Sequence, residues 1–99
     1  MSTYPACKLR VSYDDGREVF EDDDCDVCLE DGQLLITYWD ERGPVVFAGT
    51  ERGDAFEVVA RSRPSRALLT RRGDVLEGTW QERDDTGGLR IELVSPSDE

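Results

Sequence analysis

Short apolar runs alternate with glycine-containing polar turns along the whole chain. Within most runs, apolar and polar side chains follow one another in alternation, as in a β-strand with one buried face. The intervening segments carry the residues favoured in tight turns: Asp14-Asp15-Gly16, Asp31-Gly32, Glu41-Arg42-Gly43-Pro44, Glu51-Arg52-Gly53-Asp54, Arg72-Gly73-Asp74 and Asp84-Asp85-Thr86-Gly87-Gly88. The pattern predicts consecutive antiparallel strands joined by hairpins, and no segment shows the apolar period of a long helix.

The runs predict eight or nine short strands in a single domain, residues 1–99. Three consecutive aspartates, residues 22–24, interrupt the pattern between the second and third runs, and residues 63–65 interrupt it between the sixth and seventh. Residues 1–5 and 95–99 lie outside the pattern, and we expect them to be frayed. The predicted strands are 6–13, 17–21, 25–30, 33–40, 44–50, 55–62, 66–72, 75–83 and 88–94.

The turns also predict which strand residues face each other. We treat Asp15-Gly16, Asp31-Gly32 and Arg42-Gly43 as two-residue turns and residues 84–87 as a four-residue loop. Each of these registers collects apolar side chains on one face of the sheet, and a slip by one residue would scatter them. The pairs predicted in this way include Val11 with Phe20, Leu29 with Leu34, Trp39 with Val46, Ala48 with Val59, and Trp80 with Ile91.

One face of the predicted sheet is strongly apolar, and no helix is expected to cover it. Such a sheet must curl, so the predicted fold is an all-β antiparallel up-and-down meander closed into a small β-barrel, with a sandwich as the alternative. Gly49 and Gly78 fall on this face, where a missing side chain permits bending. Because the inner residues are bulky, we expect a filled interior and no small ligand. They are Leu9, Val11, Phe20, Val27, Leu29, Leu34, Ile36, Tyr38, Phe47, Phe56, Val58, Leu69, Leu76, Trp80, Ile91 and Leu93.

The opposite face is polar on the first and last strands but apolar in the middle of the sheet. The residues predicted to form this outer patch are Leu35, Trp39, Val46, Ala48 and Val59, with Cys28 and Leu68 beside them. A contiguous apolar patch that includes a tryptophan is typical of an interface, most simply that of a two-fold homodimer. Two alternatives remain: a segment around Tyr4-Pro5 covers the patch, or the outward assignment fails because the fold is a sandwich.

The chain is acidic, with 23 Asp and Glu against 12 Lys and Arg and a net charge of −11. This charge disfavours nonspecific binding to nucleic acid or to anionic membranes. It either keeps the protein soluble or attracts a basic partner. Residues 1–7 lack the basic and apolar segments of a signal peptide, and no apolar run is long enough for a membrane helix. We therefore expect a cytoplasmic location.

The side chains offer little catalytic or metal-binding chemistry. The chain has no histidine, which excludes Ser-His-Asp and Cys-His catalysis and histidine-ligated metals. No glycine-rich phosphate loop precedes a predicted helix. Cys25 and Cys28 form a CxxC motif, but no second CxxC completes a zinc site, and an odd cysteine count with Cys7 favours reduced thiols. We predict no catalytic residue, no metal and no cofactor.

Two charged segments each allow a ligand-binding interpretation and a simpler structural one. Asp22, Asp23, Asp24 and Asp26 present oxygen ligands suited to calcium, but their spacing is not that of an EF-hand, and a solvated acidic loop is favoured. The stretch from Arg61 to Arg72 contains five arginines and no acid. It could bind an anion, but pairing with acids in the first half of the chain is favoured.

Two short motifs are explained by turns and strands. Arg52-Gly53-Asp54 and Arg72-Gly73-Asp74 are RGD tripeptides at positions where a hairpin requires glycine. Gly78-Thr79-Trp80 is similar to the G-x-W strand of lipocalin- and avidin-type barrels. In those families this strand opens the barrel, whereas here it stands near the end of the chain. The resemblance covers three residues and implies no ligand or site.

These observations favour a noncatalytic binding or assembly module that forms a homodimer through the outer patch. One alternative is an acidic protein inhibitor, such as an immunity protein or a nucleic-acid mimic, which would bind a basic partner through one dense negative face. A second alternative is a lipocalin-like carrier of a small ligand. An open pocket of several hundred cubic ångströms inside the barrel would favour the carrier.

Overall fold

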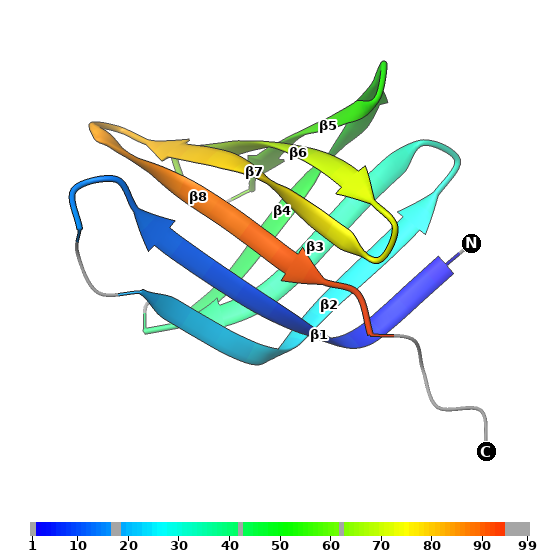
Figure 1. The fold of residues 1–99 in the computed structure, drawn as a ribbon, viewed down its shortest axis with the longest axis horizontal. Coiled ribbons are helices and arrows are strands. Elements are labelled where there is room, and N and C mark those ends of the chain that lie inside the picture. The colour runs from blue at the N-terminus through cyan, green and yellow to red at the C-terminus, as the bar shows by residue number, and fades with distance from the viewer. Residues whose placement is uncertain (1, 17–18, 42, 62, 95–99) are drawn as a thin grey trace.

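The structure, a computed structural model, describes residues 2–16, 19–41, 43–61 and 63–94. The described residues form eight β-strands and no helix (Figure 1). Neighbouring strands pair antiparallel in chain order, and the last strand pairs with the first to close a barrel. This confirms the predicted all-β meander and selects the barrel over the sandwich. The strands are β1 (Ser2–Tyr13), β2 (Phe20–Glu30), β3 (Gln33–Asp40), β4 (Gly43–Arg52), β5 (Ala55–Ala60), β6 (Ser65–Arg72), β7 (Val75–Glu82) and β8 (Asp85–Glu92).

Strand β2 continues through the three aspartates that were predicted to interrupt it. Leu9 of β1 faces Asp22, but Cys7 faces Cys25, so the register between β1 and β2 shifts by one residue across the aspartates. A β-bulge of this kind absorbs an extra residue without ending the strand. The second and third predicted strands are therefore one strand, and the barrel has eight strands rather than nine.

The N-terminal segment is part of the sheet. Thr3 faces Cys28 and Tyr4 faces Val27, so β1 begins well before the predicted start at residue 6. Only the second half of β1, residues 8–13, pairs with β8 as well as with β2. The expectation that residues 1–5 are frayed is wrong for residues 2–4. The expectation for residues 95–99 and the start of the predicted strand 17–21 lie outside the described residues.

The predicted faces of the strands are correct, although two registers are not. The pairs Val11 with Phe20, Leu29 with Leu34 and Ala48 with Val59 are confirmed. Asp31 and Gly32 have φ angles of 51° and 77°, as a type I′ hairpin turn requires. Trp39 faces Pro44 instead of Val46 because the β3–β4 turn lies one residue earlier than predicted. Trp80 faces Gly87 instead of Ile91 because the β7–β8 turn has two residues instead of the predicted four. These two registers differ from the predicted ones by two and four residues. Because both differences are even, each residue has a different partner from the predicted one but keeps its predicted face.

The inner face forms the hydrophobic core. Of the residues predicted to face inward, Val11, Phe20 and Leu29 are partly buried against the core and all the others are buried; Val45 is also buried. Gly49 permits a close approach of two strands, because a Cβ atom there would lie 1.8 Å from the Glu57 carbonyl oxygen. Gly78 is equivalent, with 1.9 Å to the Leu68 carbonyl oxygen. Both glycines therefore permit close packing of neighbouring strands, where a larger residue would collide with backbone.

The two ends of the barrel differ. The connections β1–β2, β3–β4, β5–β6 and β7–β8 lie at one end, on the left of Figure 1, and we call this end the mouth. Toward the opposite end the interior is filled by side chains that are at most 2% exposed: Leu9, Val27, Leu34, Ile36, Val58, Leu69, Leu76 and Ile91. Among the described residues there is no helix long and apolar enough to cross a bilayer.

Candidate functional site

The interior is hollow at the mouth, where a cavity of about 490 Å³ opens. The prediction of a filled interior is therefore wrong at this end of the barrel. Its apolar lining includes Val11, Phe20, Tyr38, Val45, Phe47, Trp80 and Leu89. Its polar and charged lining consists of Asp40, Glu41, Arg63, Ser65, Glu82 and Asp85.

The sequence contains a signal for this cavity in the polar residues that stand at inward positions near the ends of three strands. Inward positions alternate along a strand, so Asp40 follows Tyr38 on the inner face of β3, and Glu82 follows Trp80 on that of β7. Ser65 precedes Ala67 in the same way on β6. Polar or small residues thus occupy inward positions at the mouth, where they leave space that large apolar side chains would fill.

Trp80 forms one wall of the cavity and helps to close the barrel. Its indole Nε1 donates a hydrogen bond of 3.0 Å to the Ser12 carbonyl oxygen on β1, and its ring meets that of Tyr13 edge-on at 5.0 Å. The indole lies against Gly87 of β8, where a Cβ atom would be 2.8 Å from Nε1 and 1.8 Å from the Ser12 oxygen. The tryptophan of the G-x-W sequence therefore links β7 to β1 across a position that accepts no side chain.

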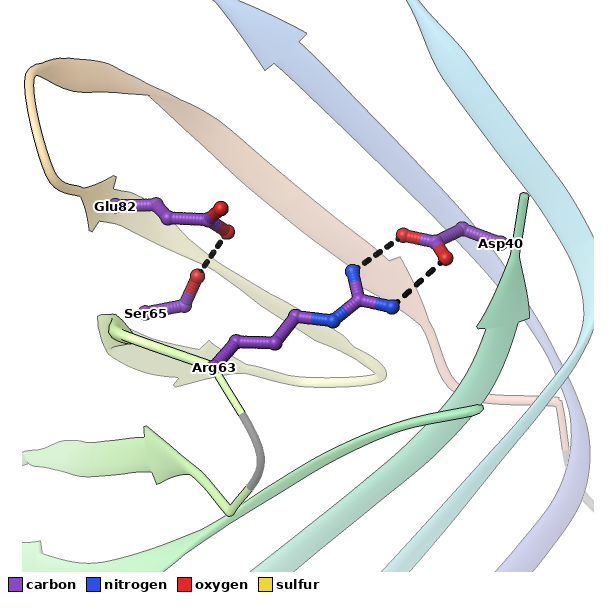
Figure 2. Close-up of polar contacts among 4 residues, drawn as sticks. All are labelled: Asp40, Arg63, Ser65 and Glu82. Carbon is purple, nitrogen blue, oxygen red and sulfur yellow. Dashed lines mark hydrogen bonds and ion pairs between the residues drawn. The ribbon is translucent and has the colours of Figure 1, made fainter. Parts of the chain in front are cut away.

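An ion pair bridges part of the rim (Figure 2). Arg63, in the β5–β6 connection, donates from Nη1 to Oδ2 of Asp40 at 2.6 Å and from Nη2 to Oδ1 at 2.9 Å. The two side chains are only 10% and 19% exposed. The hydrogen bond to Asp40 is the main reason that the pKa of Arg63 is raised above its ordinary value. The predicted pairing of the arginine-rich stretch with acids from the first half of the chain is confirmed for Arg63.

A second polar contact lies beside this pair. Ser65 and Glu82 face each other across β6 and β7, and the serine hydroxyl donates a hydrogen bond to Oε1 of Glu82 (Figure 2). Ser65 is 5% exposed, so this hydroxyl is held within the wall rather than at the outer surface. Through both contacts, polar and charged side chains of the rim are held in defined positions.

Two other arginines of the stretch make contacts of their own. Arg66 donates to the Gln81 side chain at 3.3 Å on the outer surface. Arg71 lies at the opposite end of β6, where its Nε donates to the Gly73 carbonyl oxygen at 2.9 Å. Because β6 runs the length of the barrel, the arginines near its two ends are separated, and the stretch forms no single anion site.

The cysteines do not form a joint site. Cys25 points into the core and is fully buried, whereas Cys28 is three residues further along the strand and lies half-buried on the outer face. Cys25 instead faces Cys7, which is also fully buried. Burial raises the pKa of both thiols above the ordinary value of 9.0. Within the ranges that the structure describes, no group of three potential ligands, including the aspartates of β2, is arranged to hold a metal ion.

The outer patch lies on β3, β4 and β5. Leu35, Ala48 and Val59 face one another in a row across these strands, and Val46, two residues before Ala48 on β4, lies on the same face. Trp39 is 56% exposed and Val59 55% exposed, whereas the other three are half-buried. Trp39 adjoins Pro44, so its predicted contact opposite Val46 is wrong.

The N-terminal segment does not cover this patch. Tyr4, on β1, is half-buried against the core and faces Val27 of β2, so it extends the sheet beside β2. The alternative in which Tyr4-Pro5 folds across the patch is therefore wrong.

Acidic residues occur at both ends of the barrel. Asp31, Asp54 and Asp74 lie in turns at the filled end, and Asp14 and Asp84 lie in turns at the mouth. The turns therefore do not concentrate their acids at one end. Comparison of the chain with protein-family models, with curated proteins and with solved structures found no significant match.

Proposed function

We propose that this protein is a noncatalytic barrel that binds a small molecule in the cavity at its mouth. The observation that carries the proposal is a cavity of about 490 Å³ in a barrel whose other end is filled. Its volume lies within the range of about 300–1,000 Å³ that is typical of small-molecule sites. Apolar walls with a few ordered polar groups at the rim are also typical of such sites. The cavity therefore supports the small-ligand carrier more strongly than the homodimeric module or the acidic inhibitor.

The arrangement of the rim favours binding over catalysis. Asp40 is engaged by Arg63 through two hydrogen bonds, and Glu82 accepts a hydrogen bond from Ser65. Both carboxylates are thus already engaged by neighbouring side chains. With no histidine in the chain, we propose a role in sequestering or carrying a ligand in the cytoplasm.

A pair of matched variants tests this proposal. Val11 lines the cavity, and Val59 lies on the outer face of β5. The neutral fluorophore N-phenyl-1-naphthylamine should show enhanced, saturable emission with the wild-type protein. Val11→Trp should abolish the enhancement by filling the cavity, whereas Val59→Trp should leave it unchanged. Absence of saturable binding to a folded wild-type protein, or equal loss in both variants, would contradict the proposal.

The outer patch supports a second candidate function, self-assembly into a two-fold dimer. The specific observation is that Trp39 and Val59 are more than half exposed on the outer face. Exposed tryptophan is enriched in protein interfaces. Sedimentation equilibrium should then show a dimer that Trp39→Ala converts to a monomer. A wild-type monomer at high concentration, together with unchanged stability of Trp39→Ala, would exclude this candidate and leave the cavity proposal intact.

A further inference from the structure

The Tyr38 side chain is a buried polar group directed at the cavity. Tyr38 lies on β3, is 8% exposed and belongs to the cavity lining. No hydrogen bond joins its hydroxyl to any other group in the part of the chain that the structure describes. Every fully enclosed side-chain nitrogen or oxygen in that part does have a partner, so the Tyr38 hydroxyl must be reachable from the cavity. A hydroxyl that faces a cavity and has no protein partner is available for a hydrogen bond with a bound molecule.

The surroundings of Tyr38 determine what this hydroxyl can bind. Burial raises its pKa far above the ordinary value of 10.0; the nearby Asp40 charge raises it further and Arg63 opposes this. Tyr38 therefore stays protonated and can donate a hydrogen bond at physiological pH. The same surroundings resist a negative charge, so a carboxylate or phosphate is disfavoured beside the hydroxyl.

The cavity also offers no free positive charge. Arg63 is the one cationic side chain among the described lining residues, and Asp40 already holds it through two hydrogen bonds. An anionic ligand would have to disrupt this pair or remain buried without compensation, and both are costly. The walls beside Tyr38 are aromatic: the rings of Phe20 and Tyr38 lie 5.9 Å apart, and Phe47 and Trp80 also line the cavity.

We infer that the cavity takes a small aromatic or alicyclic molecule that carries no negative charge and whose carbonyl, ether or hydroxyl oxygen accepts a hydrogen bond from the Tyr38 hydroxyl. The apolar body of the ligand packs against Phe47 and Trp80 within the mouth. This inference rests on the proposed function and adds the chemical class of the ligand and the residue that selects it.

Two uncharged probes of similar shape test the inference by calorimetry: 2-acetylnaphthalene, which has a carbonyl oxygen, and 2-isopropenylnaphthalene, which lacks one. The affinity ratio of ketone to hydrocarbon should be about three- to tenfold higher for the wild-type protein than for Tyr38→Phe. The hydrocarbon itself should bind both proteins nearly equally. Tyr38→Phe keeps the aromatic ring and removes a hydroxyl without a protein partner, so the variant should fold, as circular dichroism will check.

A charged probe completes the test. With the wild-type protein, 2-naphthoate should bind at least about tenfold more weakly than the ketone, because it buries a negative charge without compensation. If the hydrocarbon binds but the ketone ratio is the same in Tyr38→Phe, the inference is wrong and the proposed function stands. Tighter binding of 2-naphthoate than of the ketone would likewise overturn the inference. If no probe binds the folded wild-type protein, the proposed function itself fails.

Discussion

The guanidinium of Arg63 and the carboxylate of Asp40 lie face to face in two hydrogen bonds of 2.6 and 2.9 Å, although 23 residues separate them in the chain. One comes from the β5–β6 connection and the other from the last residue of β3. Their pairing across the intervening β4 holds the rim of the mouth in one arrangement. Two parallel hydrogen bonds of this type are stronger and more directional than a single contact between charges.

The losses of stability on removing each partner should therefore not be additive. Asp40→Asn leaves Arg63 with a weakened partner, and we expect a loss of about 2–4 kcal/mol in the free energy of unfolding. Arg63→Gln should cost a similar amount. The double variant should lose at least about 1 kcal/mol less than the sum of the single losses, as measured by urea denaturation. Additive losses would show that the pair does not stabilise the rim.

The contact of Trp80 with Gly87 predicts that substitution by alanine is far more destabilising at Gly87 than at its neighbour Gly88. Gly87→Ala would place a methyl group 1.8 Å from the Ser12 carbonyl oxygen, so β1 and β8 would have to move apart. We expect a loss of more than about 2 kcal/mol in the free energy of unfolding. Gly88→Ala is the matched control: its Cβ atom would lie 3.0 Å from the Ser12 hydroxyl, which can rotate away. Equal effects of the two substitutions would contradict the proposed closure.

The raised pKa of Tyr38 predicts a loss of stability in alkali. The unfolded tyrosine releases its proton near the ordinary value of 10.0, whereas the folded one holds it to higher pH because of burial. The folded state then binds more protons than the unfolded state above pH 10.0, so stability is full below this pH and falls as the pH rises through it.

The measurement compares the wild-type protein with Tyr38→Phe. The wild-type free energy of unfolding should fall more steeply above pH 10.0, with an additional slope approaching about 1.4 kcal/mol per pH unit. The cysteines titrate in both proteins, so the difference between the two curves isolates Tyr38. Parallel curves between pH 8 and 11 would show that the Tyr38 hydroxyl is not buried in the folded state.

The positions of the cysteines predict their reactivity. Cys28 is half-buried on the outer face, whereas Cys7 and Cys25 are fully buried and their thiol pKa values are raised. Ellman's reagent should modify one thiol about a hundredfold or more faster than the other two. Cys28→Ser should remove the fast phase and leave the slow one. Fast modification of two or three thiols in the folded protein would contradict the described burial.

The inward and outward faces of the strands could be predicted because a register error of an even number of residues leaves each side chain on its predicted face. The turn before Pro44 is two residues out of the predicted register and the turn after Glu82 is four, yet Tyr38 and Trp80 still point inward as predicted. The β-bulge opposite Cys7 could not be predicted in this way, because three aspartates resemble a loop in isolation. Only pairing with β1 makes a strand of them.

The cavity could not be predicted from the count of apolar inward residues. Alternation shows which way Tyr38 and Phe47 point but not whether their side chains meet across the barrel. The polar residues at inward positions, Asp40 and Glu82, were informative, yet an acid at the end of a strand is also common at a solvated surface. The pairing of Asp40 with Arg63 depends on the curvature of the sheet, which only the closed barrel defines.

The closure of β1 against β8 has a consequence for how the chain folds. Lys8 faces Glu92, so the seam of the barrel joins segments close to the two ends of the described chain. During synthesis the second half of β1 must wait until β8 has been made before it meets its partner, and meanwhile it presents an open strand edge. Closure of the barrel should thus follow the synthesis of β8, and loss of β8 should leave two exposed edges that pair with other molecules. Truncation at residue 84 should yield aggregates rather than a smaller barrel.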